Sequence, residues 1–490
     1  MSIKYDEVEN YILKIKKIIV KKIEKKRWNE ALSLISAAAD ILYDTNLYYV
    51  DWDLENDIAA IAKELIEPGF LKKNLNEDIL VFYDGFGLNT RGLAQIYLKA
   101  LCKIKRVVYI TYVEAEKRIP DIQAIVKNNN GKIIYLEKTS LVKRIYALDQ
   151  MIKTYKPQNF FFYAAPNDVV ATTIMNAYQG IIKNFQINLT DHAFWLGAKP
   201  IDCCIEFRSY GACISKRYRN IPQDKIFEIP FYPIINYDEK FKGFPFDVKK
   251  NQKVVFSGGF LYKTLGGENK YYKIVDYMLE KHQDVIFWYA GRGDQTEIDK
   301  IIKKYPNRAY LTAERSDLFQ VLKHSYLYLS TYPLCGGLMF QYAASASKVP
   351  ITLRQGSVTD GFLINQDHLK IQFDDMDLFL NELDYLLDHP EYTQERGELM
   401  RKSVISETAF QKAVSQLLEN KNTGYEITYK EVDTEEFRQN YLDTLTSTNI
   451  CLTMARIDNG VVCEVYPWMF LKGCVIRVKN RIEKKFNLIK

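Results

Sequence analysis

At 490 residues the chain is too long for one ordinary hydrophobic core, so we expect two domains of roughly 200 residues each. Apolar residues make up 47% and charged residues 26%, as is typical of a soluble globular protein, and no apolar run reaches the ~18 residues that would span a bilayer. The net charge is +6, and the stretch Lys472–Lys490 alone supplies +6 from seven Lys/Arg and one Glu, so the near-neutral remainder argues against a general nucleic-acid binder.

Residues 1–75 are expected to form a helical N-terminal extension. Isoleucines recur there at helical spacing, and the stretch RWNEALSLISAAADILYD is amphipathic. The opening MSIKYDEVEN lacks the apolar segment of a signal peptide, and the eight cysteines show no C-x-x-C spacing. We therefore expect a cytoplasmic protein with reduced thiols and no metal site.

Residues 76–235 alternate between strand and helix, with TRGLAQIYLKALCKI and DIQAIVKNN as helices. Apolar, β-branched strands that alternate with helices imply a parallel sheet covered on both faces, which is a Rossmann-like domain. The predicted strands are DILVFYDGF, RVVYITYV, KIIYLEK, QNFFFYAAP, FQINLTD, CCIEF and KIFEIPFYPI.

A second alternating region follows a polar stretch. Residues 236–252, NYDEKFKGFPFDVKKNQ, contain Gly, Pro and many charges and are predicted to be a linker. Residues 253–420 then resume the pattern, so the predicted fold class is α/β, with two doubly wound Rossmann-like domains that face a cleft. Residues 421–490 are expected to return to the first domain and to end in the basic tail. The strands predicted in the second domain are KVVFSGGF, VIFWYAG, AYLTAE, YLYLST and PITLR.

Two loops of the second domain are rich in glycine: SGGFLYKTLGG after its first strand and YPLCGG after a later one. In doubly wound sheets ligands bind beyond the carboxyl ends of the strands, and a helix N-terminus offers unpaired N–H groups to an anion. Gly336 and Gly337 before LMFQYAAS therefore suit a phosphate or diphosphate, to which Lys263 would add a positive charge. Tight packing alone also requires glycine at such turns, so each loop taken singly leaves both interpretations open. Neither loop matches the Walker or G-x-G-x-x-G pattern.

The order of these segments resembles the nucleotide-sugar half of GT-B-fold glycosyltransferases, particularly the O-linked N-acetylglucosamine transferase type, and bacterial polysaccharide glycosyltransferases. FSGGFLYK is similar to the family's loop whose lysine contacts the donor diphosphate, and PLCGGLMFQYAASASKVPI to its phosphate-binding turn and helix. IFWYAGRG and AERSDLFQVLKHS match the segments between them, of which the second borders the base. The resemblance covers roughly residues 190–360 and includes WLG at Trp195 and the stretch IPQDKIFEIPFYP in the first domain.

The resemblance implies a metal-independent glycosyltransferase without a cofactor. It would move a sugar from a nucleoside-diphosphate donor, with UDP favoured, to a glycan, lipid-linked or protein acceptor in bacterial surface polysaccharide or glycoprotein assembly. The leaving-group charge would be met by helix N-termini and cations. The donor-binding residues it implies are Gly258, Gly259, Phe260, Lys263, Arg292, Glu314, Arg315, Gly336, Gly337, Leu338, Met339 and Gln341.

The chain departs from the family in two places. Ala343 stands where the family has an acid that holds the ribose, and Leu338-Met339-Phe340 replace its His-Thr-Thr. Gln341 or Glu314 could take over the ribose contact. Two alternatives therefore stay open: a catalytically inactive GT-B subunit that binds a partner transferase or an acceptor protein, and a nucleotide-sugar epimerase.

The candidate catalytic groups are Asp191 and His192, just past a predicted strand of the first, acceptor-side domain, together with Lys263. An inverting transferase needs a base that titrates near neutral pH, which suits histidine, although a structural role for His192 is an equal alternative. The stretch YDGFGLNTRGL lies at another strand end and supplies the acceptor-side candidates. These are Gly85, Gly87 and Arg91, the last of which either faces donor phosphate or caps a helix.

The tail YPWMFLKGCVIRVKNRIEKKFNLIK alternates apolar and basic residues and carries Trp468. Basic residues are attracted to anionic lipids, so peripheral contact with the inner face of the cell membrane is one interpretation. The alternative is a final helix packed on the first domain with a solvated basic face. The sequence leaves homo- or hetero-oligomerisation open.

Overall fold

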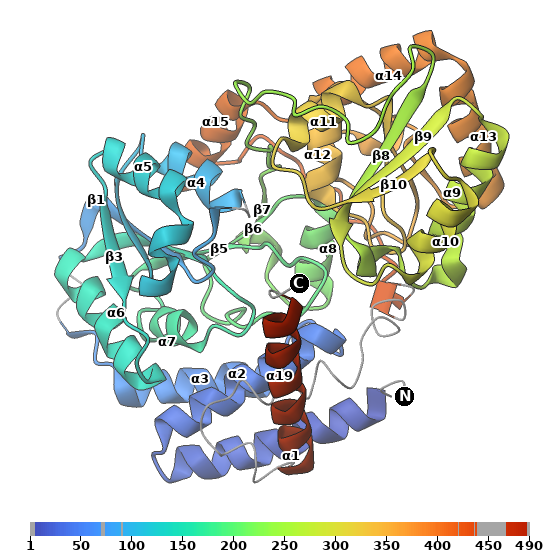
Figure 1. The fold of residues 1–490 in the computed structure, drawn as a ribbon. Coiled ribbons are helices and arrows are strands. Elements are labelled where there is room, and N and C mark those ends of the chain that lie inside the picture. The colour runs from blue at the N-terminus through green and yellow to red at the C-terminus, as the bar shows by residue number, and fades with distance from the viewer. Residues whose placement is uncertain are drawn as a thin grey trace. The chain divides into compact units, whose positions relative to one another are not determined.

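The computed structural model describes residues 5–69, 74–89, 92–419, 421–435, 437–438 and 467–487. The chain divides into two compact units (Figure 1). The first unit comprises Met1–Ile229, Phe410–Lys430 and Tyr441–Lys490, and the second comprises Pro230–Ala409 and Glu431–Asn440. The predicted strands of both sheets are confirmed, and the fold is the two-domain α/β arrangement of GT-B proteins.

The first unit is built on a seven-stranded sheet of order β3-β2-β1-β4-β5-β6-β7, in which every neighbouring pair is parallel. The strand order reverses between β1 and β4, which makes this pair the topological switch point. The strands are β1 (Asn76–Asp84), β2 (Arg106–Tyr112), β3 (Lys132–Leu136), β4 (Pro157–Tyr163), β5 (Lys183–Ile187), β6 (Cys203–Glu206) and β7 (Ile226–Glu228).

The central strands of this sheet are buried on both faces. Leu80 to Asp84 of β1 form an unbroken buried run, as expected for a parallel strand covered by helices. The rings of Phe82, Phe161 and Phe185 stack across three neighbouring strands, with centroid separations of 6.4 and 4.4 Å. The covering helices are α4 (Leu93–Leu101), α5 (Pro120–Asn128), α6 (Leu141–Tyr155), α7 (Val169–Ala177) and α8 (Ser209–Arg217).

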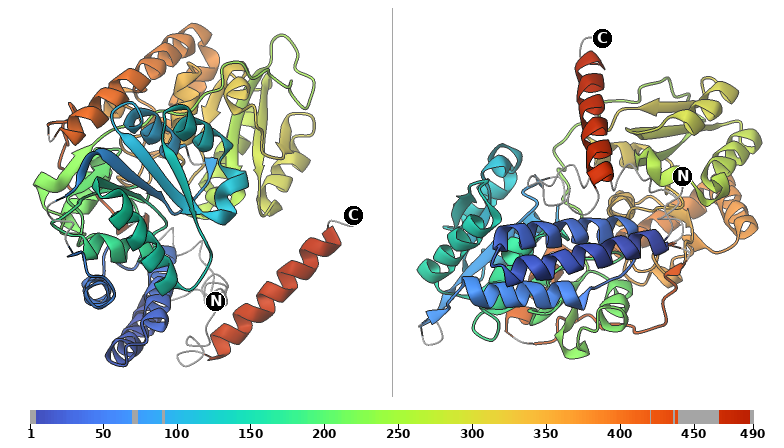
Figure 2. Two further views of the ribbon diagram at one scale, coloured as in Figure 1. Left: turned by 90° about the vertical axis from the view of Figure 1, so that its left-hand side faces the viewer. Right: turned by 90° about the horizontal axis from the view of Figure 1, so that it is seen from below.

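The predicted helical extension consists of three helices that precede the first sheet: α1 (Tyr5–Glu24), α2 (Trp28–Thr45) and α3 (Trp52–Leu65). They run alongside one another in the right-hand view of Figure 2. Their apolar residues share one hydrophobic core with strands β1 and β2. The extension is therefore an integral part of the first unit and is not a separate appendage.

The second unit contains a six-stranded parallel sheet of order β10-β9-β8-β11-β12-β13, with its switch point between β8 and β11. Its strands are β8 (Lys253–Phe260), β9 (Val285–Arg292), β10 (Ala309–Thr312), β11 (Leu327–Leu329), β12 (Pro350–Leu353) and β13 (Gln372–Phe373). The helices of the second unit are α9 (Lys270–Lys281), α10 (Thr296–Lys304), α11 (Leu318–His324), α12 (Gly337–Ser345), α13 (Met376–Asp388) and α14 (Pro390–Lys402), whereas most of α15 (Glu407–Leu418) belongs to the first unit.

Residues 236–252, predicted as a linker, pack within the second unit. The Phe246 ring stacks on Tyr310 of β10 at 4.2 Å, and Phe244 meets the edge of Trp288 of β9 at 5.9 Å. The Lys242 amide donates to the Asp317 carboxylate at 2.9 Å. The aromatic residues of this polar segment therefore anchor it to the second sheet.

One more helix, α19 (Pro467–Asn487), lies near the end of the chain. Among the described residues no helix combines the length and apolar character needed to cross a membrane.

Candidate functional site

The two glycine-rich loops of the second unit leave neighbouring strands at its switch point. Phe256 of β8 is in register with Tyr328 of β11, so both loops start at the same edge of the sheet. The first loop continues into the 3-10 turn Leu261–Thr264, and the second runs through Gly336 into α12. At a switch point the connections that leave the two strands run to opposite faces of the sheet, and the crevice between them can hold a ligand.

The Lys263 ammonium lies beside the Gly336 turn. Its Nζ is 3.5 Å from the position that a Cβ on Gly336 would occupy, and its carbonyl accepts a hydrogen bond from the Leu334 amide at 3.2 Å. Burial lowers the pKa of Lys263, and Cys335 partly offsets that shift. Among the described residues no carboxylate contributes to this pKa. A partly desolvated cation of this kind gains free energy from an anionic ligand.

The N-terminus of α12 adds backbone donors next to this cation. Gly336 is the N-cap and has no side-chain cap, while the amides of Met339 and Phe340 donate to its carbonyl at 3.0 and 3.3 Å. The amides of Gly337 and Leu338 belong to the first turn, whose N–H groups have no acceptor within the helix. They point along the helix axis at its N-terminal end, where the helix dipole is positive. Lys263 and the start of α12 thus combine a full and a partial positive charge.

The structure constrains the two glycines of this turn differently. Gly336 has φ −126°, and an added Cβ would meet Lys263 Nζ and Met339 Cγ at ordinary contact distances of 3.5 and 3.9 Å. An added Cβ on Gly337, by contrast, would overlap the Phe362 ring. Packing therefore requires glycine at 337, whereas the space beside 336 is open as far as the lysine.

The ends of β8, β9 and β10 bring together three of the predicted donor residues. Arg292 lies over the Phe260 ring at 4.8 Å, and its Nε is 3.3 Å from the Glu314 carboxylate. All three side chains are exposed. Strand packing requires glycine at 291, because a Cβ there would overlap the Gly259 carbonyl oxygen, and a Cβ on Gly258 would lie 3.0 Å from the Ala290 oxygen. Gly259 has φ +123°, a backbone conformation that favours glycine.

Two other predicted donor residues have structural partners. Arg315 forms a two-point ion pair with Asp317, both contacts at 2.7 Å, and also donates to the Gly243 carbonyl at 3.1 Å. Gln341 is buried, and its amide donates to the Phe362 carbonyl. Ala343, at the position of the family's ribose acid, is fully buried. The ribose contact proposed for Gln341 would therefore require its side chain to leave the core.

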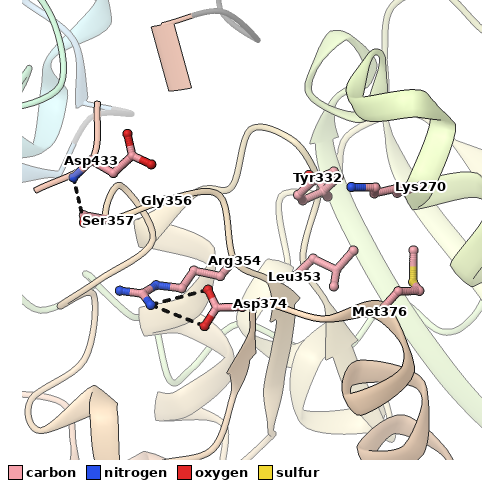
Figure 3. Close-up of a pocket in the computed structure, with 9 residues that line it drawn as sticks. All are labelled: Lys270, Tyr332, Leu353, Arg354, Gly356, Ser357, Asp374, Met376 and Asp433. Carbon is pink, nitrogen blue, oxygen red and sulfur yellow. Dashed lines mark hydrogen bonds and ion pairs between the residues drawn. The ribbon is translucent and has the colours of Figure 1, made fainter. Parts of the chain in front are cut away.

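A cavity of about 350 Å³ lies beside the second loop (Figure 3). Tyr332 forms one wall, with the Lys270 amino group 6.0 Å from the centre of its ring. Arg354 crosses the floor toward Asp374, 3.4 Å away, and also pairs with Asp360 at 2.9 Å. The lining is polar and of mixed charge. Lys263 and Gly336 are not among its lining residues.

In the first unit Asp191 and His192 follow β5, as the sequence predicted. His192 is partly exposed, and its Nδ1 is 3.2 Å from the Asp191 carboxylate. The other oxygen of Asp191 accepts from Arg208 Nε at 2.6 Å, and both residues are buried. Burial alone would raise the pKa of Asp191, but Arg208 and His192 hold it well below its usual range. The ionised Asp191 therefore orients the His192 ring.

A buried polar cluster, which the sequence analysis missed, supports this loop. Glu206 accepts two hydrogen bonds from the Asn188 amide at 2.9 and 3.0 Å and one from Ser215. Burial raises the pKa of Glu206, while Arg219 opposes the rise. The Arg219 guanidinium donates to the carbonyls of Asp191 and Ala193 at 3.1 and 2.6 Å. Charge at the end of the apolar strand CCIEF was the only signal in the sequence.

The N-terminal helices hold the same loop from a distance in sequence. Asn46, at the end of α2, donates to the His192 carbonyl at 2.9 Å. The fully buried Glu55 carboxylate of α3 accepts from the amides of Gly197, Ala198 and Lys199 at 2.7, 3.3 and 3.2 Å. Burial raises the pKa of Glu55 to about 6, although these hydrogen bonds act to lower it. The extension thus holds the loop that carries His192 at two places.

The acceptor-side glycines are explained by packing. A Cβ on Gly85 would lie 2.8 Å from the Ala164 Cβ, and Gly87 has φ +55° and sits against Ala115. The buried Asp84 carboxylate accepts from the Phe86 and Gly87 amides at 2.9 Å each, which fixes the turn. This turn lies at the switch point of the first sheet. Arg91 lies outside the described residues.

Comparison with known proteins defines the fold. No family model and no curated protein matches the sequence. A glycosyltransferase from Rickettsia africae ESF-5 matches with a TM-score of 0.53 at 12% identity, covering 70% of this chain and 98% of that one. An O-GlcNAc transferase from Thermobaculum terrenum matches with a TM-score of 0.50 at 11% identity, covering 90% of this chain and 84% of that one.

A third solved structure of the same fold is named for a different activity. It comes from Listeria monocytogenes, is named as a candidate UDP-N-acetylglucosamine 2-epimerase, and matches with a TM-score of 0.50 at 10% identity over 72% of this chain and 100% of that one. At such low identity these likenesses establish the GT-B fold and leave the activity to the site.

Proposed function

We propose that the chain is a glycosyltransferase that moves a hexosyl or N-acetylhexosaminyl group from a nucleoside-diphosphate-sugar, with UDP as the favoured nucleotide. The proposed acceptor is a glycan, a lipid-linked saccharide or a protein in bacterial surface polysaccharide or glycoprotein assembly. The GT-B fold and the loop sequences FSGGFLYK and PLCGG support this class. No metal or cofactor is part of the proposal.

The observation that carries the proposal is the position of Lys263 beside the Gly336 turn. Its Nζ lies 3.5 Å from the site of a Gly336 Cβ, next to the uncapped start of α12, and burial lowers its pKa. A diphosphate placed there would accept hydrogen bonds from the first-turn amides and an ion pair from the lysine. The same groups would stabilise the charge that develops on the diphosphate as the bond to the sugar breaks.

His192 is the proposed catalytic base. In an inverting transfer it would take the proton of the acceptor hydroxyl as that oxygen bonds to the anomeric carbon and the nucleoside diphosphate departs. Asp191 is a positioning residue, since its carboxylate, held by Arg208, keeps the ring in one orientation through Nδ1. The first unit thus serves the acceptor and the second unit holds the donor diphosphate.

Two alternative functions rest on specific observations. The buried Ala343 in place of a ribose acid favours a catalytically inactive subunit that binds nucleotide and a partner protein. The epimerase among the structural neighbours favours conversion of a nucleotide-sugar without any acceptor. With a UDP-sugar alone, an epimerase changes the sugar, a transferase needs an acceptor to release UDP, and an inactive subunit binds with neither outcome.

Thermal-shift measurements against UDP-, GDP-, CMP- and dTDP-sugars test the donor site. Ligand at about 100 times its Kd stabilises the folded state by about 2.7 kcal/mol, so even micromolar affinity is measurable at millimolar concentration. We expect a shift with the UDP-sugars that is lost in Lys263→Met. It should also be lost in Gly336→Asp, which would place a carboxylate within reach of the lysine and neutralise it.

The matched control is Lys273→Met, which removes an exposed lysine on α9. It should keep the full shift. A substitution at Gly337 is unsuitable, because any side chain there would overlap Phe362 and test packing instead of binding. If both Lys263→Met and Gly336→Asp keep the shift, the donor site is wrongly assigned.

A further inference from the structure

Helix α19 carries a continuous stripe of exposed apolar side chains. The stripe residues are 49% to 81% exposed and are separated alternately by three and four positions, which places them on one face of the helix. They are Trp468, Leu471, Val475, Val478 and Ile482. Exposed apolar residues are common singly, but a stripe over four helical turns marks a surface that binds something.

Three basic residues border the stripe. Lys472 and Lys479 follow stripe residues on one side, and Arg481 precedes the last of them on the other. Over its whole length the helix holds six Lys/Arg and one Glu, which gives it a net charge of +5. The single acid of this segment, Glu483, follows Ile482 in the sequence.

This charge pattern decides between two occupants. The alternating spacing of three and four also suits a coiled coil with a second copy, in which the bordering positions of the two helices face each other. Here no bordering position carries an acid, so a pair of these helices would gain no ion pair between them, and an antiparallel pair would set Lys472 of one copy near Lys479 of the other. The surface of an anionic bilayer, by contrast, would bury the apolar stripe and attract the basic residues beside it at the same time.

We propose that α19 lies flat on an anionic lipid bilayer, with its apolar stripe among the headgroups and its basic borders against lipid phosphates. At 1.5 Å per residue the helix is roughly 31 Å long, so its stripe can enter the interface along its whole length. Trp468 suits this environment because its ring is amphipathic. The helix carries too many charges to cross the bilayer, in keeping with the finding for the described residues.

Vesicle sedimentation with the full chain tests the proposal. One set of vesicles contains phosphatidylcholine alone, and the other contains about one-third phosphatidylglycerol. We expect at least about tenfold tighter binding to the anionic vesicles, with a loss of that preference as salt screens the charges. A triple variant, Leu471→Ser, Val475→Ser and Val478→Ser, should weaken binding to the anionic vesicles about tenfold or more.

Leu378→Ser is the matched control, because Leu378 is equally exposed but lies on α13 of the second unit. It should bind as the unaltered chain does. Equal binding to both kinds of vesicle, or full binding by the triple variant, would overturn the proposal. A triple variant that changes the oligomeric state in gel filtration while neither protein binds vesicles would assign the stripe to a second copy. Nucleotide-induced stabilisation should be the same in all these proteins, so this test is independent of the donor site.

Discussion

The Lys263–Gly336 site of the second unit and the His192 loop of the first unit are built in different ways. The first uses backbone amides and one cation from two short loops that leave adjacent strands. The second depends on side chains that reach it from helices more than 140 residues earlier in the chain. An anion site needs little more than a turn and a charge, whereas a histidine held in one orientation needs a buried polar network.

The largest effect that would sharpen this comparison is expected for His192→Asn. Loss of the base should reduce kcat about 10² to 10⁴-fold, because general-base catalysis contributes that much. Donor affinity should not change, since the diphosphate is assigned to the second unit. Steady-state kinetics with a UDP-sugar and an acceptor, combined with thermal shift, would measure both quantities.

His368→Asn, at an exposed position of the second unit, is the control and should leave kcat unchanged. A His192→Asn variant with normal kcat would show that the histidine is structural. Because Asn46 binds the backbone carbonyl of His192, that anchor survives the substitution. A loss of activity can therefore be separated from a loss of folding by a denaturation curve.

Arg208→Met should destabilise the first unit by about 3–5 kcal/mol, because it leaves the buried Asp191 carboxylate without its charge partner. Arg401→Met removes an arginine from an exposed ion pair with Glu398 and should cost about 1 kcal/mol or less. Urea denaturation would compare the two variants. Similar small losses in both would mean that Asp191 is not held by this pair.

A smaller effect is expected for Glu55→Gln. The amide group cannot accept from all three backbone donors of residues 197–199, so we expect a loss of about 1–3 kcal/mol in the free energy of unfolding. Glu64→Gln, on the exposed face of the same helix, should change stability by about 1 kcal/mol or less. Equal effects would remove Glu55 from the support of the loop.

Glu55 also predicts a dependence on pH. Its folded pKa of about 6 lies above the ordinary value of 4.5, so its protonated form is favoured in the fold. The contribution of protonated Glu55 to the free energy of unfolding is fully present below pH 4.5 and is lost as the pH rises through 6. Over that interval the unaltered chain should lose roughly 2 kcal/mol relative to Glu55→Gln. Unfolding curves at several pH values would show parallel stabilities if the shift is absent.

The features of this fold that can be predicted from the sequence are those set by residues close together in the chain. Strands such as DILVFYDGF are predictable because a parallel strand buried on both faces must be apolar along its length. The loop with Gly336 and Gly337 is predictable because the chain turns from strand to helix within a few residues. Asp191 and His192 are predictable as candidates because they follow a strand directly.

The support of His192 could not be predicted, because its partners are set by tertiary packing. Nothing in the spacing of Asn46 or Glu55 indicates that they bind backbone groups 146 and 142 residues later. The aromatic residues of 236–252 likewise read as part of a linker, since their partners Trp288 and Tyr310 lie on strands far along the chain. From the sequence alone Gln341 is a candidate ligand contact, because its burial and its hydrogen bond to the Phe362 carbonyl depend on tertiary packing.

The smallest effect is expected for the stability of Lys263→Met. The unaltered chain keeps a partly buried ammonium that no carboxylate among the described residues stabilises, so methionine of similar shape should raise the free energy of unfolding by up to about 1 kcal/mol. Because burial lowers the pKa of Lys263, this gain is fully present below the lowered pKa and fades as the pH rises from there to 10.5. Denaturation curves at neutral and alkaline pH would measure it, with Lys273→Met as the control. A variant that loses nucleotide binding but gains stability would mark Lys263 as a residue kept for its ligand, whereas a destabilised variant would mark it as part of the fold.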